Sequence, residues 1–305
     1  MGNKILLSLC IPTSGVVEWI IPVIDSIYAQ GVDNTLFEVV VTDNGDKDDL
    51  QEAVKNIEHE NFHYYRTTSK GFTNQIDAFE KCSGEFCKML NHRSKLISGS
   101  LCQLLDFVRK YRDTKPILYC AEGHAKGGEF IECENTDEFV KSLSYYVSWS
   151  AGTGAWRKDI KDVRNENIDN YFPHTVFLFG LRNESKYVIW NGKYENMTSD
   201  AGKGGYDVFY AFSVRFLDIL NNLRIDNKIS PKTFVSQKKE LFNFLKNLYL
   251  NEVVLPTKHT FVIEDVCSNM RIYYGTYYYC IMIIQSWLKA PIVCFQYLSR
   301  KCLHI

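Results

Sequence analysis

The sequence predicts an α/β fold, a doubly wound and mainly parallel sheet followed by a helical C-terminal region. Three observations lead to this prediction. Over roughly the first 100 residues, short apolar runs alternate with segments of helical periodicity. Polar clusters follow several of the apolar runs directly, as they do at the carboxyl ends of parallel strands. The residues after 231 show long amphipathic patterns that are rich in aromatic side chains.

Each early element has a local signal. A buried strand is stopped by Pro12, a helical apolar repeat ends at Gly31, and a run rich in valine forms the second strand. A fourth apolar run follows Gly84 and suits a central strand. Strands are expected at residues 4–11, 37–42, 63–66, 86–90 and 117–120, and helices at 19–30, 50–57, 74–82 and 96–111.

The second half of the chain is less regular. A polar, glycine-containing segment predicts a loop or hairpin, and a tyrosine-rich run predicts a short strand before a turn at Gly152 and Gly154. A loop or hairpin is expected at 122–137. Strands are expected at 145–150 and 186–190, and helices within 168–181, 206–220 and 233–250.

Composition excludes several classes of protein. The net charge of the 305 residues is -1, which gives no bulk electrostatic reason to bind nucleic acid. The ten cysteines have no Cys-x-x-Cys pair, so we expect reduced thiols in a cytosol rather than a disulfide framework or a zinc site. The first apolar run is too short for a signal peptide.

Polar residues follow three of the predicted strands, and in a parallel sheet all three groups meet at one edge. They are Pro12-Thr13, Asp43-Asn44 and Asn91-His92-Arg93. Lys70, Gly71 and Asn74 lie where a loop enters a helix, a place that favours an anion. The sequence contains no dinucleotide-binding glycine motif, no phosphate-binding Gly-Lys-Ser/Thr loop and no Gly-x-Ser-x-Gly elbow.

These residues carry a resemblance to a known family. Ser-Leu-Cys-Ile-Pro-Thr at 8–13, Val-Val-Val-Thr-Asp-Asn-Gly at 39–45, Lys-Gly-Phe-Thr-Asn at 70–74 and Ser-Gly-Glu at 83–85 occur in the order of a family 2 glycosyltransferase with the type-A fold. Tyr-Phe-Pro-His at 171–174 resembles the acceptor half of bacterial abequosyltransferase-like enzymes. The resemblance covers roughly residues 5–101 and is thin beyond them.

The resemblance implies a nucleotide-diphosphate sugar as donor and a glycan as acceptor, the latter lipid-linked as in O-antigen or capsule assembly. It also implies a nucleotide-sugar-binding half at 1–101, an acceptor half at 102–230 and a helical, aromatic region at 231–305. From the residues alone, a strand terminator or a turn former would account for several of the positions just as well. The donor-binding candidates are Pro12, Thr13, Asp43, Asn44, Lys70, Asn74, Asn91, His92 and Arg93.

One departure from the family concerns the metal. Where such enzymes carry an Asp-x-Asp cluster that holds Mg²⁺ or Mn²⁺, this chain has Asn91-His92-Arg93-Ser94, without a carboxylate. Because hard divalent ions prefer oxygen ligands that include a carboxylate, we expect no metal cofactor. Arg93 could bind phosphate oxygens directly through its forked guanidinium. A lone His92 ligand remains the alternative, as does a site that has lost activity.

Inverting transfer also requires a general base. The family's base is an acidic residue in the second half, and Asp169 is the first candidate, with Glu166 second. We expect His174 to be packed or hydrogen-bonded, and Trp156 to lie in the core or stack on an acceptor sugar.

The sequence thus predicts an inverting glycosyltransferase. The alternatives are an inactive binding or scaffold protein with the same fold and a nucleotidyltransferase, the latter disfavoured because no basic, glycine-rich loop follows Ile11. The aromatic run at 277–297 is interrupted by polar residues, which predicts a peripheral contact with the inner face of a membrane. A helix pair packed on the protein's own core is the other reading of that run.

Overall fold

The computed structural model describes residues 5–160, 168–182, 186–197, 204–255 and 260–303. The chain forms two compact units, Met1–Ser199 and Asp200–Ile305, which are described separately. The predicted division into donor half, acceptor half and C-terminal region is a functional one, and it stays a prediction. By compactness alone, the helices between residues 208 and 225 lie in the second unit, although we placed them in the acceptor half.

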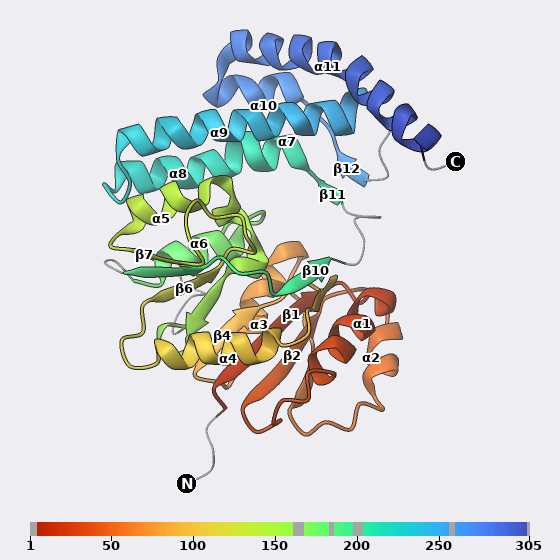
Figure 1. Cartoon of the computed structure of the whole chain (residues 1–305), viewed down its shortest axis with the longest axis vertical. Coiled ribbons are helices and arrows are strands. Elements are labelled where there is room, and N and C mark those ends of the chain that lie inside the picture. Colours follow the sequence, from red (N-terminus) through yellow and green to blue (C-terminus); the bar gives the residue numbers. More distant parts are fainter. Residues whose placement is uncertain (1–4, 161–167, 183–185, 198–203, 256–259, 304–305) are drawn as a thin grey trace. The chain divides into compact units, whose positions relative to one another are not determined.

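The first unit is built on a five-stranded sheet in the order β3-β2-β1-β4-β8 (Figure 1). The first four strands are parallel to their neighbours, and only β8 runs antiparallel, against β4. This confirms the predicted fold class, a mainly parallel sheet. The strands are β1 Leu7–Thr13, β2 Phe37–Asp43, β3 Phe62–Arg66, β4 Phe86–Met89 and β8 Gly154–Trp156.

Helices cover both faces of this sheet, which explains why its central strands are apolar on both sides. Leu9 and Ile11 of β1 pack in one core cluster with side chains of α1 and α4. Cys10, between them in the sequence, packs in the opposite cluster with side chains of α3 and α6. The helices of this unit are α1 Val17–Tyr28, α2 Asp49–Val54, α3 Asn74–Lys81, α4 Ser100–Lys110, α5 Thr136–Leu143 and α6 Pro173–Gly180.

Two smaller sheets complete the first unit. In one, the strand order is β6-β9-β7, with β9 parallel to β6 and antiparallel to β7. In the other, β5 pairs with β10 antiparallel. The strands are β5 Ser94–Leu96, β6 Ile117–Cys120, β7 Phe130–Cys133, β9 Tyr187–Trp190 and β10 Glu195–Met197.

The strand predicted at residues 145–150 is wrong. Ser144–Ser148 and Ser150–Gly152 form 3₁₀ turns instead. The reason is a side chain from another strand, because the buried Tyr119 hydroxyl bonds the carbonyls of Tyr146 at 2.7 Å and Trp149 at 3.0 Å. Carbonyls that converge on one hydroxyl do not alternate in direction as those of a ladder do.

The second unit is mainly helical. α7 Val208–Tyr210 and α8 Phe216–Ile225 are joined by a π-helical turn, Ala211–Arg215, and α9 Pro231–Tyr249 follows. α10 Val266–Tyr273 and α11 Gly275–Leu303 end the described chain, and β11 Gly204–Asp207 pairs with β12 Thr260–Val262. The predicted helix at 206–220 begins later than expected, because the Asp207 carboxylate accepts from the amides of Phe209 and Tyr210 and caps α7.

Candidate functional site

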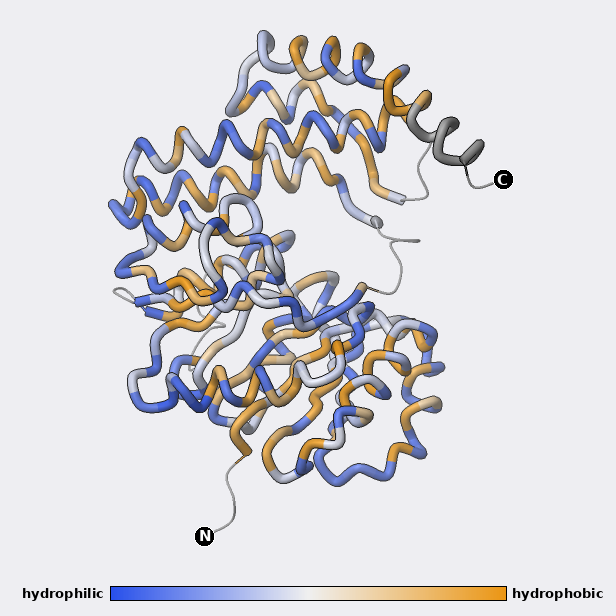
Figure 2. Tube along the Cα trace, viewed as in Figure 1, coloured by the Kyte–Doolittle hydropathy of each residue, from blue (hydrophilic) through white to orange (hydrophobic). Residues whose placement is uncertain are grey.

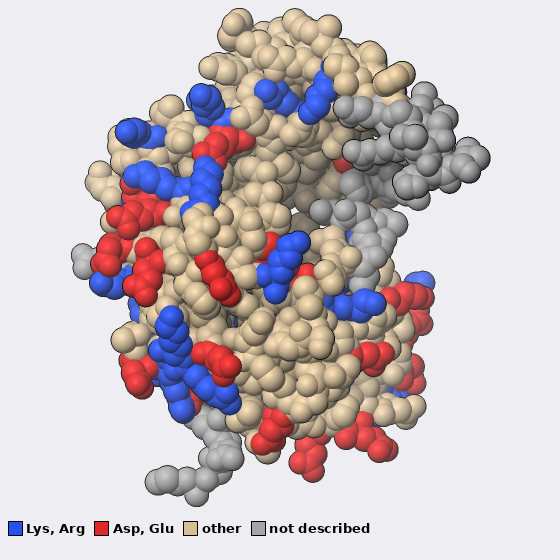
Figure 3. Space-filling view, viewed as in Figure 1, with Lys and Arg blue, Asp and Glu red and all other residues tan. Residues whose placement is uncertain are grey.

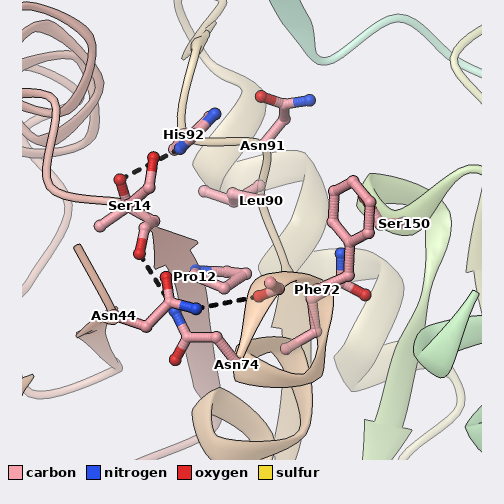
Figure 4. A pocket seen from close by; sticks show the side chains of 12 residues that line it. Pro12, Ser14, Asn44, Phe72, Asn74, Leu90, Asn91, His92 and Ser150 are labelled. Carbon is pink, nitrogen blue, oxygen red and sulfur yellow. Dashed lines mark hydrogen bonds between the residues drawn. The ribbon is translucent and has the colours of Figure 1, made fainter. Parts of the chain in front are cut away.

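A cavity of about 240 Å³ opens at the carboxyl edge of the parallel strands (Figure 4). Residues from three strand ends line it, as the topology requires. They come from the end of β1, from the residue after β2 and from the turn after β4, and the segment between β3 and α3 closes the cavity from the side. The lining residues are Pro12, Thr13, Ser14, Asn44, Gly71, Phe72, Asn74, Gln75, Leu90, Asn91, His92 and Ser150.

The structure brings six of the ten predicted site residues to this cavity. Those in the lining are Pro12, Thr13, Asn44, Asn74, Asn91 and His92. The other four, Asp43, Lys70, Arg93 and Asp169, are not among its lining residues. Each of these four has a position that the sequence did not reveal.

His92 closes the end of β1. Its Nδ1 lies 3.1 Å from Thr13 Oγ1, and that hydroxyl also accepts from the amide of Gly15 at 3.2 Å. Burial is the main cause that lowers the pKa of His92 to about 4, and the positive charge of Arg93 is the second. The imidazole is therefore neutral near pH 7, and it accepts from the Thr13 hydroxyl if Nδ1 carries no proton.

Asp43 supports the loop after β2 from beneath. Its carboxylate is fully buried and accepts from Gly45 N at 2.8 Å, Tyr64 OH at 2.8 Å and Arg66 Nη1 at 2.9 Å. The loop also passes so close to the end of β1 that a Cβ on Gly45 would lie 2.2 Å from Ser14 O. The donor contact of Asp43 stays a prediction, and its carboxylate fixes the loop that presents Asn44.

Two asparagines tie the loop before α3 to the sheet. Asn74 Nδ2 donates to Thr13 O at 3.1 Å and to Thr42 O at 2.8 Å, and so bridges the ends of β1 and β2. Asn44 Nδ2 donates to the carbonyls of Ser69 and Gly71. Lys70, between those two residues, has an exposed side chain beside the cavity rather than within its lining.

Arg93 is buried on the other side of the turn after β4. Its guanidinium carbon lies 3.6 Å from the centre of the Trp19 ring, a close cation–π stack. The turn itself is held by Asn91 Oδ1, which accepts from the Arg93 amide at 2.9 Å. The cavity therefore receives Asn91 and His92 from this turn, while the guanidinium packs on α1.

Asp169 begins the segment that leads into α6. It is 5% exposed, and its Oδ1 accepts from the amides of Tyr171 and Phe172, both at 2.8 Å. Glu166, the second candidate for the base, lies outside the described residues. Asp169 and the cavity are linked through α6, because His174 contacts Gln75, which lines the cavity.

His174 is buried and hydrogen-bonded, as predicted. Its Nε2 lies 2.8 Å from Ser148 O, and its Nδ1 lies 2.7 Å from the side-chain oxygen position of Gln75. Burial lowers the pKa of His174 to about 4, against smaller opposing effects of the hydrogen bond to Ser148 O and the charge of Asp169. Trp156 lies in the core, where its Nε1 donates to Pro116 O at 2.7 Å, so the acceptor-stacking alternative is wrong in this structure.

Sequence reasoning missed a buried cation below the cavity. Lys88, in the middle of β4, is 1% exposed and donates to Met89 O at 2.7 Å and to Ala151 O. These two carbonyls adjoin Leu90 and Ser150, which line the cavity. The only signal in the sequence was a lysine inside an otherwise apolar strand. Across from it, burial raises the pKa of Glu195 to about 7, against the opposing charge of Lys88.

Comparisons with known proteins define the class. Residues 8–117 match the model of glycosyl transferase family 2, and no curated protein matches the sequence. The matched residues hold the parallel strands and most of the cavity lining. The match covers residues 8–117 of the 305, and together with the mainly parallel sheet it supports a glycosyltransferase with the type-A fold.

Solved structures agree on the fold. S. aureus TarS 1-349 has a TM-score of 0.57 at 15% identity, over 82% of this chain and 75% of that one. The same protein in complex with UDP has a TM-score of 0.54 at 16% identity, over 82% and 73%. In complex with UDP-GlcNAc it has a TM-score of 0.51 at 16% identity, over 80% and 73%. At this identity the similarity is one of fold.

The divalent ion typical of this family does not fit the residues present. The turn after β4 offers an amide, a neutral imidazole, a guanidinium and a hydroxyl, and the described lining residues include no carboxylate. Among the residues that the structure describes, no group of three or more His, Cys, Asp and Glu could hold a metal ion. Mg²⁺ and Mn²⁺ favour carboxylate oxygens, so this donor set is a poor match.

Proposed function

We propose that the protein is an inverting glycosyltransferase that moves a sugar from a nucleotide-diphosphate donor to a lipid-linked glycan, as in O-antigen or capsule assembly. The abequosyltransferase-like group remains the proposed subgroup. The observation that carries the proposal is the convergence of three polar strand ends on one cavity, inside a domain that matches family 2. Complexes of the similar fold of TarS with UDP and UDP-GlcNAc support a nucleotide sugar as donor.

The proposed donor site is the cavity at the strand ends. Pro12, Thr13 and Asn44 would contact the nucleoside, with Asn74 and the segment beside Lys70 nearby. Asn91 and His92 would lie toward the diphosphate. The lining is nearly uncharged, which suits the planar amide and hydroxyl groups of a base and ribose better than it suits a free inorganic anion.

Asp169 is the proposed general base. Transfer with inversion requires removal of the proton from the acceptor hydroxyl as its oxygen attacks the anomeric carbon and the bond to the diphosphate breaks. The Asp169 carboxylate is fixed by two backbone amides at the start of α6, which would hold it in a defined direction. Such fixation reduces the entropy that a mobile base would lose in the transition state.

We further propose that transfer proceeds without a divalent cation. The leaving nucleoside diphosphate gains charge as the bond breaks, and fixed donors or cations must stabilise it. Arg93 and Lys70 are the cations on the two segments that flank the cavity. From its position on the Trp19 ring, Arg93 would stabilise the diphosphate through its electrostatic field. Alternatively, its side chain would change rotamer when the donor binds and contact the diphosphate directly.

The protein is proposed to work in the cytoplasm, peripherally at the inner face of the membrane. A lipid-linked acceptor is confined to the membrane surface, so an enzyme that also uses a soluble nucleotide sugar benefits from contact with both phases. The apolar C-terminal helix supports this location.

An inactive binding or scaffold protein with the same fold is the second candidate. The observation in its favour is the uncharged lining of the cavity, which lacks the carboxylates usual in active relatives. It differs from an active enzyme in one measurable respect, the release of nucleoside diphosphate.

One experiment tests the proposals together. Donor binding and nucleoside diphosphate release are measured over a panel of nucleotide sugars, with bacterial lipid-linked glycans as acceptors, in EDTA and then with Mg²⁺ or Mn²⁺ added. Release in EDTA supports metal-free transfer. Release only after addition of the ion overturns that part alone. Donor binding without release, with or without the ion, favours the inactive alternative.

A further inference from the structure

The outer face of α11 is almost free of charge. Between Gly275 and Phe295 the sequence contains a single charged residue, Lys289. The inner face is a narrow stripe of Met282, Ser286 and Ala290, all buried. Large apolar side chains cover the outer face, and in Figure 2 this helix is largely orange or pale. The most exposed of them are Tyr277, Ile284, Trp287, Leu288, Ile292 and Phe295.

An exposed surface of this kind is unusual for a helix in water. Surface helices usually place charged residues opposite their buried stripe. Here Trp287 is 59% exposed, Leu288 70% and Phe295 73%. In Figure 3 the surface at the position of α11 is correspondingly almost all tan. A contiguous apolar patch of this kind marks a surface that another phase or molecule covers.

The helix is long and apolar enough to span a bilayer by length and composition. The candidate segment Gly275–Phe295 has 21 residues. In an apolar stretch of 18 of these residues, 17% are buried. At 1.5 Å per residue it would measure about 30 Å, close to the hydrocarbon thickness. However, the inner face of α11 packs against α9, which presents polar side chains to it.

Three hydrogen bonds hold α11 along α9. Lys246 Nζ donates to Gln285 Oε1 at 3.0 Å, Ser286 Oγ donates to Lys246 O at 3.3 Å, and Lys289 Nζ donates to Asn247 Oδ1 at 3.1 Å. A spanning orientation would either break these contacts or carry Lys246 into hydrocarbon, which is costly. With α9 in place, only the outer face of α11 can meet lipid.

The charge of this part of the chain indicates which lipid. Residues 266–305 contain four Lys and Arg and no Asp or Glu. Residues 200–305 contain 13 Lys and Arg against 8 Asp and Glu, although the whole chain has a net charge of -1. Cations beside an apolar, aromatic face are the pattern of helices that lie in the interface of an anionic membrane.

We propose that the outer face of α11 inserts into an anionic bilayer surface, with the helix axis parallel to the membrane plane. The rings of Tyr277, Trp287 and Phe295 enter the headgroup region, and the exposed Arg271 of α10 faces anionic headgroups. The inference deepens the proposed function and rests on it for the lipid-linked acceptor, whereas the contact itself follows from the face of α11 alone.

Vesicle binding by the full-length protein tests the proposal. Vesicles of phosphatidylcholine alone are compared with vesicles that also contain phosphatidylglycerol, without donor or acceptor. We expect binding to the anionic vesicles, weakened by added salt. The variant Trp287→Ser/Leu288→Ser should lose at least about tenfold in affinity, because two large apolar side chains no longer leave water. No binding by the wild type overturns the proposal.

The second unit offers a matched control. Ile225→Ser/Val235→Ser removes two apolar side chains that are 60% and 65% exposed but lie on α8 and α9, away from the α11 face. This variant should bind vesicles like the wild type. A loss equal to that of the α11 variant contradicts the proposal. If Trp287→Ser/Leu288→Ser changes the circular dichroism spectrum, the variant Ile292→Ser/Phe295→Ser is used in its place.

Two further outcomes assign the face to another occupant. Resistance of membrane-bound protein to alkaline carbonate would indicate a spanning helix and overturn the interfacial arrangement. A dimer that the α11 variant abolishes, without any vesicle binding, would assign the face to a second copy. Because vesicle binding is measured without turnover, an absence of transfer activity overturns the proposed function and leaves this inference standing.

Discussion

The guanidinium of Arg93 lies 3.6 Å from the centre of the Trp19 ring, and the His92 imidazole lies against the same ring at 5.2 Å. Two neighbouring residues of the turn after β4 thus share one aromatic side chain of α1. The stack fixes the direction in which His92 meets Thr13. It also keeps a positive charge beside His92, which helps to hold the pKa of that imidazole low.

Replacement of Arg93 tests this arrangement. Arg93→Ala should raise the pKa of His92 from about 4 toward its ordinary value, because the nearby charge is gone and water gains access. Donor binding and transfer should weaken together. Arg93→Lys should restore the charge but not the planar stack, and should recover them only in part. NMR titration of His92 and calorimetric donor titration measure the two effects.

Arg109→Ala is the control for that prediction. Arg109 is an exposed arginine on α4 that pairs with Asp106, and its removal should leave both the His92 titration and donor affinity as in the wild type. Wild-type donor affinity in Arg93→Ala would exclude Arg93 from the donor site.

Asp169 can be tested with its structural role preserved. Asp169→Asn keeps an oxygen that accepts from the amides of Tyr171 and Phe172, so α6 should begin as before. The amide cannot take up the acceptor proton, and transfer should fall by about 10²–10⁴ with donor binding unchanged. Asp169→Ala should add a loss of stability. Single-turnover transfer and thermal unfolding separate the two, and wild-type turnover in Asp169→Asn would redirect the search to Glu166.

Asn74 is predicted to hold the donor cavity together. Asn74→Ala leaves the carbonyls of Thr13 and Thr42 without their shared donor, and should lower the free energy of unfolding by about 1–3 kcal/mol. Asn74→Asp should cost more, because a carboxylate would face two carbonyl oxygens. Both variants should also weaken donor binding. Urea unfolding gives the comparison, with the exposed Asn56→Ala as control; equal stability of all three variants would contradict this role.

The sequence predicted the elements of the parallel sheet because their signals are local. The second strand was expected at 37–42 and is found at Phe37–Asp43, since a β-branched run bounded by turn residues needs no distant partner to be identified. The meeting of Thr13, Asn44 and His92 followed from topology, because parallel strands end at one edge.

Contacts between distant residues could not be predicted in the same way. Asp43 is paired by Tyr64 and Arg66 from the next strand, and nothing near Asp43 in the sequence indicates this. Gly84, in a motif shared with the family, lies at the opposite edge of the sheet from the cavity. A Cβ there would lie 2.6 Å from Ser8 Oγ, so that motif residue serves packing between strands.

The dependence of stability on pH should report on His174. Its pKa is about 4 in the folded protein because of burial, and about 6.5 in an unfolded chain. Between these values the unfolded state binds more protons at this residue, so the contribution of His174 to stability falls as the pH drops from 6.5 to 4 and is constant on either side. The shift corresponds to a loss of about 3 kcal/mol. Glu195, with its pKa raised to about 7, acts in the opposite direction, losing stability as the pH rises.

A comparison of variants isolates the histidine from Glu195 and from His92. His174→Gln retains a side-chain donor for Ser148 O but has no titrating group, so its unfolding free energy should fall less between pH 7 and pH 4 than that of the wild type. His59→Gln, on an exposed ring, should follow the wild type. Urea unfolding at a series of pH values measures this difference. If His174→Gln loses as much stability as the wild type over that range, a neutral, buried His174 does not contribute to the acid sensitivity of the fold.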